Sequence, residues 1–217
     1  MDQNYAAARD HMVDGQVRPN KVIDPRIIRA MRTLPRERFV PPQAISMAYV
    51  DEDVPLGGGR YLVEPMVIAR LIQLARIRDG DRVLIVGAGP GYGAALAAAC
   101  GGMVTALEQD PALLAIARRL LREFAPGVTV AEGPLDQGLP GAWNTIVIEG
   151  SVVAIPPHLA ALVPVGGRLV TVINQDGAGQ GVLAERGAPG TPLGHTEAFS
   201  CATPLLRPLV PAPTFQF

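Results

Sequence analysis

The stretch "VLIVGAGPGYGAALAAACGGMVTAL" (residues 83–107) decides the fold of this 217-residue chain. It runs for 25 residues without a charged side chain, yet it contains six glycines and one proline. Three kinds of segment could have this composition: a membrane span, the opening of a nicotinamide-binding domain, or the cradle of another nucleotide. A membrane-spanning helix needs about 20 apolar residues in one regular helix. Here four glycines and Pro90 follow directly after the β-forming run 83–86, which predicts a strand, a tight turn and then a helix.

The predicted helix covers about residues 91–100 and ends at Gly101-Gly102, as helices commonly end at glycine. A second strand is predicted over 103–107, so the stretch is a buried βαβ unit and not a membrane span. The alternation continues with a helix that starts at Asp110 and Pro111, an N-cap followed by a first-turn proline. Further elements are predicted as strands at 128–130, 145–148 and 168–173, a short helix at 155–163, and a hairpin from weak strands at 181–185 and 195–199. This pattern predicts an α/β fold, a doubly wound and mostly parallel sheet with an antiparallel C-terminal edge.

Composition limits the class of protein, its partners and the cellular compartment that we expect. Hydrophobic residues at 48% and charged residues at 18% are typical of a globular chain, and the length fits one domain. A formal net charge of −1 provides no basic field, so we expect neither nucleic acid nor a membrane surface as a partner. Cys100 and Cys201 lack metal-type spacing, as do the three scattered histidines, so we expect buried thiols, no metal site and a reducing, cytoplasmic location. The N-terminal segment has no apolar core of the kind found in a signal peptide.

The glycine turn predicts a nucleotide site. Glycines let the backbone approach a ligand closely, and the following helix N-terminus offers free N–H groups. Residues 89–94 satisfy the pattern G-x-G-x-x-A, and Glu108, at the end of the second strand, suits the hydroxyls of an adenosine ribose. Both features fit NAD and S-adenosylmethionine alike, and Glu108 could also be a solvated carboxylate. About 80 residues precede the turn and only about 130 follow it, which favours one mononucleotide cradle behind a helical cap, as in a methyltransferase.

Several longer segments carry a resemblance to a known family. They are "MVDGQV" (12–17), "DPRIIRAMRTLPRERFVP" (24–41), "AYVDEDVPLGGG" (48–59), "GDRVLIVGAGPGYGAALA" (80–97), "VTALEQDPALLAIA" (104–117) and "IPPHLAALVPVGGRLV" (155–170). On these segments the chain resembles the protein-L-isoaspartate O-methyltransferase family from about residue 12 to about residue 173. The run "AMRTLPRERFVP" is the most specific of them, because general methyltransferases lack it. The last forty residues match poorly.

The resemblance implies a Rossmann-like class I methyltransferase domain that uses S-adenosylmethionine. Its parts would be a cap with the substrate loop (1–78), a cofactor-binding core (79–174) and a C-terminal hairpin and tail (175–217). The residues implied to bind the cofactor are Gly87, Ala88, Gly89, Gly91, Tyr92, Glu108, Gln109, Gly133, Pro134 and Leu135. The implied substrates are damaged proteins, methylated for repair on the side-chain carboxylate of isoaspartyl residues. A carboxylate with a pKa of about 4 is ionised at neutral pH, so the reaction needs alignment and no general base.

The substrate loop departs from the family. Where the family has Thr-Ile-Ser-Gln-Pro, this chain has Tyr-Leu-Val-Glu-Pro at 61–65, so Val63 stands at the position of the active-site serine and has no hydroxyl. A Glu64 carboxylate about 5 Å from the substrate carboxylate would repel it by about 3 kcal/mol, which slows the reaction roughly a hundredfold. Pairing with Arg60 or Arg18 would cancel most of that repulsion. Alternatively, Glu64 caps the helix that begins at Pro65.

Other departures bear on cofactor binding. Ile85 stands where many methyltransferases have an acidic residue, and Pro134-Leu135 replaces Asp-Gly beside the adenine. The acidic run 51–53 lies either near the cleft or in a solvated turn, and Trp143 is expected in the core. Three interpretations remain open: an active isoaspartyl methyltransferase, a methyltransferase for another acceptor, or a non-catalytic module that binds the cofactor or a protein. The sequence leaves the oligomeric state undetermined.

Overall fold

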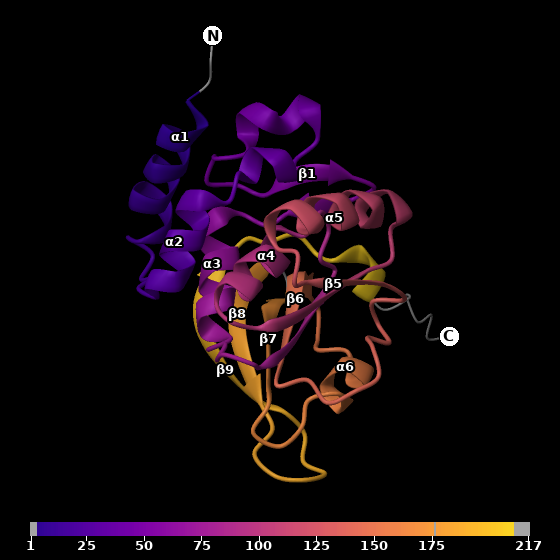
Figure 1. Ribbon diagram of the computed structural model, residues 1–217. Coiled ribbons are helices and arrows are strands. Elements are labelled where there is room, and N and C mark those ends of the chain that lie inside the picture. The colour runs from indigo at the N-terminus through magenta and orange to yellow at the C-terminus, as the bar shows by residue number, and fades with distance from the viewer. Residues whose placement is uncertain (1–3, 176, 211–217) are drawn as a thin grey trace, which may run out of the picture.

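A twisted seven-stranded sheet lies at the centre of the computed structural model, which describes residues 4–175 and 177–210 (Figure 1). Its spatial order is β5-β4-β3-β6-β7-β8-β9. The strands are β3 (Arg82–Val86), β4 (Met103–Glu108), β5 (Thr129–Glu132), β6 (Thr145–Val152), β7 (Arg168–Gln175), β8 (Ala178–Glu185) and β9 (Gly194–Cys201). Neighbours from β5 to β7 run parallel, whereas β8 and β9 add as an antiparallel hairpin. The predicted fold class and the edge hairpin are therefore confirmed.

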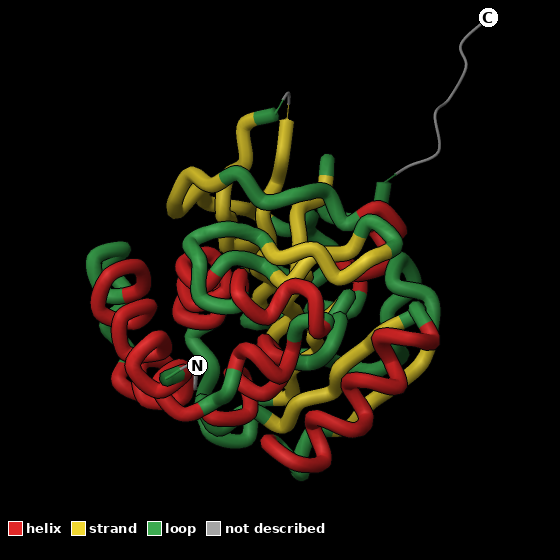
Figure 2. The backbone as a smooth tube through the Cα atoms, turned by 90° about the horizontal axis from the view of Figure 1, so that it is seen from above, coloured by secondary structure: helices red, strands yellow, loops and turns green. Residues whose placement is uncertain are grey.

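Helices flank the strands, as the view from above shows (Figure 2). The helical elements are α1 (Tyr5–Met12), η1 (Val13–Val17), α2 (Pro25–Thr33), η2 (Arg36–Phe39), η3 (Pro42–Met47), α3 (Pro65–Leu74), α4 (Tyr92–Ala99), α5 (Pro111–Phe124), α6 (Pro157–Ala161) and η4 (Arg207–Leu209). A small hairpin of β1 (Val54–Gly57) and β2 (Arg60–Leu62) precedes α3. The predicted N-cap is confirmed, because the Asp110 carboxylate accepts hydrogen bonds from Ala112 and Leu113. Helix α6 is shorter than predicted, since Pro164 disfavours helical backbone at the residue before it.

Alternate residues of the central strands face two separate cores. Val83 and Ile85 of β3 belong to a core shared with the N-terminal helices and α4, whereas Leu84 and Val86 face a second core with α6. Trp143 packs in the second core with its indole N–H donated to a carbonyl, as expected for core packing. No helix within 4–175 and 177–210 is long and apolar enough to cross a membrane.

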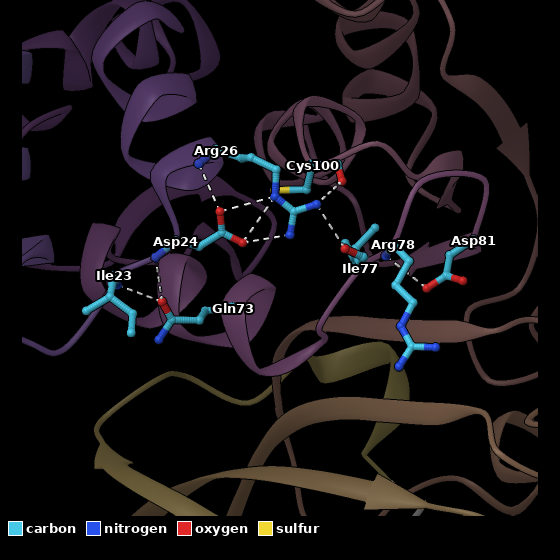
Figure 3. Close-up of polar contacts among 8 residues, drawn as sticks. All are labelled: Ile23, Asp24, Arg26, Gln73, Ile77, Arg78, Asp81 and Cys100. Carbon is cyan, nitrogen blue, oxygen red and sulfur yellow. Dashed lines mark hydrogen bonds and ion pairs between the residues drawn. The ribbon is translucent and has the colours of Figure 1, made fainter.

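Polar side chains around the start of α2 hold the N-terminal cap together and join it to the end of α4 (Figure 3). Asp24 caps α2 and pairs with Arg26, whose Nη1 donates to the carbonyls of Ile77 (3.1 Å) and Cys100 (2.7 Å). Gln73 of α3 accepts with Oε1 from the backbone N–H of residues 23 and 24 and donates with Nε2 to the carbonyl of residue 21. The position of the cap therefore depends on side-chain bonds that reach into segments distant in sequence.

Replacing Gln73 by alanine should lower the free energy of unfolding by about 1–3 kcal/mol. The change removes three hydrogen bonds that contribute roughly 0.5–1.5 kcal/mol each, and at the two exposed bonds water can replace the lost partner. Urea unfolding measures the effect, and Gln43→Ala, at an exposed position of η3, is the matched control. Equal stability of the two variants would contradict the anchoring role of Gln73.

Candidate cofactor and acceptor site

The glycine turn after β3 lies at the carboxyl edge of the sheet, where α/β proteins bind ligands. Gly87, Gly89 and Gly91 have φ angles of 74°, 53° and 99°, which residues with a side chain rarely adopt. The N–H groups of Gly87 and Ala88 donate to the carbonyl of Leu107 at 3.0 and 3.1 Å, which fixes the turn against β4. Gly91 precedes the first turn of α4, so the N-terminus of that helix faces the same place. We call residues 87–91 the glycine nest.

Glu108, the residue predicted to hold a ribose, is fully buried at the end of β4 beside the nest. Five donors surround its carboxylate: Arg60 Nη1 at 2.7 Å and Arg60 Nη2 at 2.8 Å, and the backbone N–H groups of Gly89 (2.8 Å), Gln109 (2.9 Å) and Asp110 (2.9 Å). A carboxylate offers about four lone-pair positions, so none is left for a ribose hydroxyl in this conformation. Glu108 is therefore a buried ion-pair partner here, and its role toward a ribose stays a prediction.

Glu64 pairs with neither of the two arginines that could cancel its repulsion of the acceptor. Arg60 binds Glu108 and also donates to the Gly87 carbonyl at 3.0 Å, and Arg18 pairs with Asp14 at 3.1 Å. Glu64 occupies the N-cap position of α3, yet its side chain makes no capping hydrogen bond. The physical reason lies in β2, because Arg60 there points inward toward the buried carboxylate, which offers a far stronger field than a half-exposed one.

The cavity beside the nest is too small for a nucleoside in this conformation. Its volume is about 10 Å³, and its lining includes Arg60, Glu149 and Leu206. One water molecule needs about that volume, whereas pockets for small ligands measure roughly 300–1,000 Å³. A nucleoside therefore does not fit inside this cavity while its lining side chains lie as they do.

Glu149 lines this cavity and was not among the residues predicted for the site. It lies in β6, 7% exposed, with Oε1 so close to Gly93 that a Cβ there would be 2.0 Å away. This Oε1 atom has no hydrogen-bond partner among the described residues. Burial raises the pKa of Glu149 to about 8, while attraction by Arg60 and repulsion by Glu108 act in opposite directions. The signal was present: a glutamate interrupts an apolar strand at the carboxyl edge of the predicted sheet.

The buried guanidinium of Arg36 anchors the backbone of the substrate loop. Arg36 is fully buried and donates to the carbonyls of Val63 (Nη2, 2.8 Å) and Ala48 (Nε, 2.8 Å). Val63 is itself buried, and the Glu64 N–H donates to the Asp53 carboxylate at 3.0 Å. Burial raises the pKa of Asp53 to about 6, and burial together with repulsion from the acidic run 51–53 raises the pKa of Glu64 to about 7. Near pH 7 Glu64 is therefore about half protonated, whereas Asp53 is mostly ionised.

The remaining predicted site residues divide into two groups. The first lies beside β4: the Gly133 N–H donates to the Glu108 carbonyl at 3.3 Å, and the Leu135 N–H to Gln109 Oε1 at 3.1 Å, with Pro134 between them. Tyr92 is the other, and its side chain points away from the nest into the core. Its ring packs on Phe39 and under the Arg36 guanidinium, so only its backbone is left for a ligand.

Three further expectations concern Ile85, the thiols and the acidic run. Ile85 is a buried core residue of β3. Cys100 and Cys201 are free thiols, but Cys201 is only half-buried, because it ends the edge strand β9. In the run 51–53 the first two side chains are exposed and only Asp53 turns toward the loop. Among the described residues no group of three or more His, Cys, Asp or Glu side chains could hold a metal ion.

Replacing Glu149 by glutamine should flatten the dependence of stability on pH. Its pKa is raised from 4.5 to about 8 on folding, so the folded chain binds the extra proton between these values and stability falls as pH rises, by up to about 1.4 kcal/mol per unit. Glutamine cannot ionise, so the stability of the variant relative to the original chain should rise between about pH 5 and about pH 8. Urea unfolding across that range measures the gain. The exposed Glu197→Gln is the control, and parallel curves for all three chains would contradict the assignment.

Comparison with known proteins agrees with this architecture. A family model described as protein-L-isoaspartate(D-aspartate) O-methyltransferase matches residues 7–191. A relative named protein-L-isoaspartate O-methyltransferase 1, from Rhodopseudomonas palustris, is 36% identical over 82% of this chain and 74% of its own length. A second, from Methylorubrum extorquens, is 37% identical over 82% of this chain and 78% of its own.

Solved structures share the fold. A protein-L-isoaspartate O-methyltransferase structure superposes with a TM-score of 0.77 at 23% identity, covering 91% of this chain and 65% of that one. Another structure is described as a β-aspartate methyltransferase from Plasmodium falciparum in complex with S-adenosyl-L-homocysteine. It superposes with a TM-score of 0.72 at 17% identity, covering 94% of this chain and 99% of that one. By the family match and the identity to its relatives, this chain belongs to the protein-L-isoaspartate O-methyltransferase family.

Proposed function

We propose that this protein transfers a methyl group from S-adenosylmethionine to the side-chain carboxylate of L-isoaspartyl residues in damaged proteins. The observation that carries the proposal is the family match over residues 7–191, which includes both the glycine nest and the substrate loop. When bound, S-adenosylmethionine supplies a methyl group already activated on its sulfonium. Damaged proteins or peptides are the partners, and the two free cysteines support a reducing, cytoplasmic setting.

The residues of this chain contribute position and charge and no proton transfer. The acceptor carboxylate is ionised at neutral pH, so the absence of a hydroxyl at Val63 removes no base. Arg36 positions the loop, because it bonds the Val63 carbonyl from a fully buried site. Alignment of reacting atoms can contribute about 7–11 kcal/mol to a bimolecular reaction, which makes the rigidity of this loop the chief structural requirement.

A second candidate function is methyl transfer to an acceptor that is not a carboxylate. The half-buried carboxylates of Asp53 and Glu64 favour it, since an acidic loop attracts a cationic acceptor and repels an anionic one. The two functions differ in how the rate depends on the charge of Glu64.

Methyl transfer to a matched pair of synthetic peptides, one with isoaspartate and one with aspartate, tests the proposed function. We expect radiolabelled methyl to appear only in the isoaspartyl peptide. Val63→Ser should raise the rate, because a hydroxyl can donate to the acceptor carboxylate. Transfer to a cationic peptide but to neither member of the pair would favour the second candidate, and transfer to no peptide would contradict both.

Glu64→Gln should raise kcat/KM for the isoaspartyl peptide above pH 7 and leave it nearly unchanged near pH 6. The pKa of Glu64 is about 7, so repulsion of the acceptor grows as the pH rises through that value and reaches roughly a hundredfold in rate when ionisation is complete. The pH profile of kcat/KM measures this, with the exposed Glu132→Gln as control. An equal decline in all three enzymes would show that Glu64 does not face the acceptor.

A further inference from the structure

The C-terminal part of the described chain crosses the carboxyl edge of the sheet. We call residues 203–209 the strap; in Figure 1 it is the yellow segment that runs from β9 over the upper ends of the strands. Three hydrogen bonds attach it to Ser151 of β6: the Ser151 N–H donates to the Pro204 carbonyl (3.0 Å), the Leu206 N–H to the Ser151 carbonyl (2.8 Å), and Ser151 Oγ to the Thr203 carbonyl (2.8 Å). The strap is therefore paired to the sheet like a short extra strand.

Leu206 fills the open side of the glycine nest. A Cβ placed on Gly87 would lie 2.8 Å from Leu206 Cδ2, and one on Gly150 would lie 3.0 Å from Leu206 Cβ. Leu206 and Leu209 are both buried and belong to the second core. The space that the absence of a side chain at Gly87 provides is thus occupied by the protein itself.

Arg60 closes the same place from the other side. Its guanidinium donates hydrogen bonds to both carboxylate oxygens of Glu108 and to the Gly87 carbonyl. Its Nη2 would be 3.4 Å from a Cβ on Gly87. The hairpin that carries Arg60 also meets the strap, because a Cβ on Gly59 would lie 2.9 Å from Arg207 Cδ. Strap and hairpin therefore meet over the nest and leave the cavity of about 10 Å³ described above.

We infer that this chain holds its own cofactor site closed, with Arg60 and Leu206 occupying the places that S-adenosylmethionine needs. This rests on the proposed function, because it takes the glycine nest and Glu108 as the cofactor site. Binding then requires Arg60 to leave Glu108 and the strap to move off Gly87. If the open form is a fraction f of the population, the apparent Kd is raised by the factor 1/f.

Binding of S-adenosylhomocysteine, which needs no acceptor and no turnover, tests the closure by calorimetry. We expect weak binding by the original chain and at least tenfold tighter binding by Leu206→Ala, which opens the space over Gly87. Arg60→Gln should also tighten binding, because it removes the cation that pairs with Glu108 and keeps a polar side chain at position 60. Leu193→Ala and Arg82→Gln are matched controls, because both residues lie outside the cavity beside the nest. Circular dichroism checks that each variant is folded.

Two results would overturn the inference. If the original chain binds as tightly as the two variants, the closing contacts do not compete with the cofactor. If neither the original chain nor a double variant binds, the closed contacts are not what excludes it. Failure of the proposed function is separate, since a chain can bind S-adenosylhomocysteine with the expected gain and still methylate no peptide.

Hydrogen exchange of the original chain provides a second measurement that needs no variant. The N–H groups of Ser151 and Leu206 bond across the strap, so saturating S-adenosylhomocysteine should speed their exchange at least tenfold if the strap is displaced. The N–H of Leu114, which donates to the carbonyl of the N-cap residue Asp110 at the start of α5, should not change in the same way. Bound ligand with unchanged or slower exchange at the N–H groups of both Ser151 and Leu206 would overturn the inference.

Discussion

The ion pair between Arg60 and Glu108 is the interaction on which the carboxyl edge of the sheet depends. It joins three segments that are far apart in sequence: the β1–β2 hairpin, the glycine nest and the end of β4. Both side chains are buried, so the pair has lost its solvation and is stable only because further donors complete the carboxylate. Removing one member would leave a buried charge without a partner, a loss of about 3–5 kcal/mol in comparable pairs. The geometry of the nest and of the substrate loop therefore cannot be considered separately.

Charge balance at this edge differs from what a carboxylate acceptor would favour. Glu149 and Asp53 line the cavity beside the nest and Glu64 follows Val63 of the same lining, whereas Arg60 binds Glu108 and Arg36 binds backbone carbonyls. The protein meets this excess of acid by binding protons, since burial raises the pKa values of all three carboxyl groups toward neutrality. These groups consequently repel a bound anion less at mildly acidic pH than at alkaline pH.

The sequence was most informative where local and periodic signals decide the structure. The βαβ unit at 83–107, the N-cap at Asp110 and the edge hairpin follow from patterns a few residues long, and each is present. The choice of partner for Arg60 could not be predicted in the same way, because Glu108 is 48 residues away and competes with Glu64, which is four residues away. Burial decided between them, and burial is a property of the fold. The strap escaped prediction for a related reason, since its residues have no periodicity and bond to β6 through backbone atoms.

The contact between Gly93 and Glu149 couples two positions that are 56 residues apart in the chain. A Cβ on residue 93 would lie only 2.0 Å from Glu149 Oε1 and 2.6 Å from its carboxyl carbon. A larger residue at 93 therefore requires the Glu149 side chain to turn to another rotamer, and its carboxylate would have to find a new place in a buried region. The effect of enlarging residue 93 consequently depends on which side chain stands at 149, so substitutions at the two positions should not be additive.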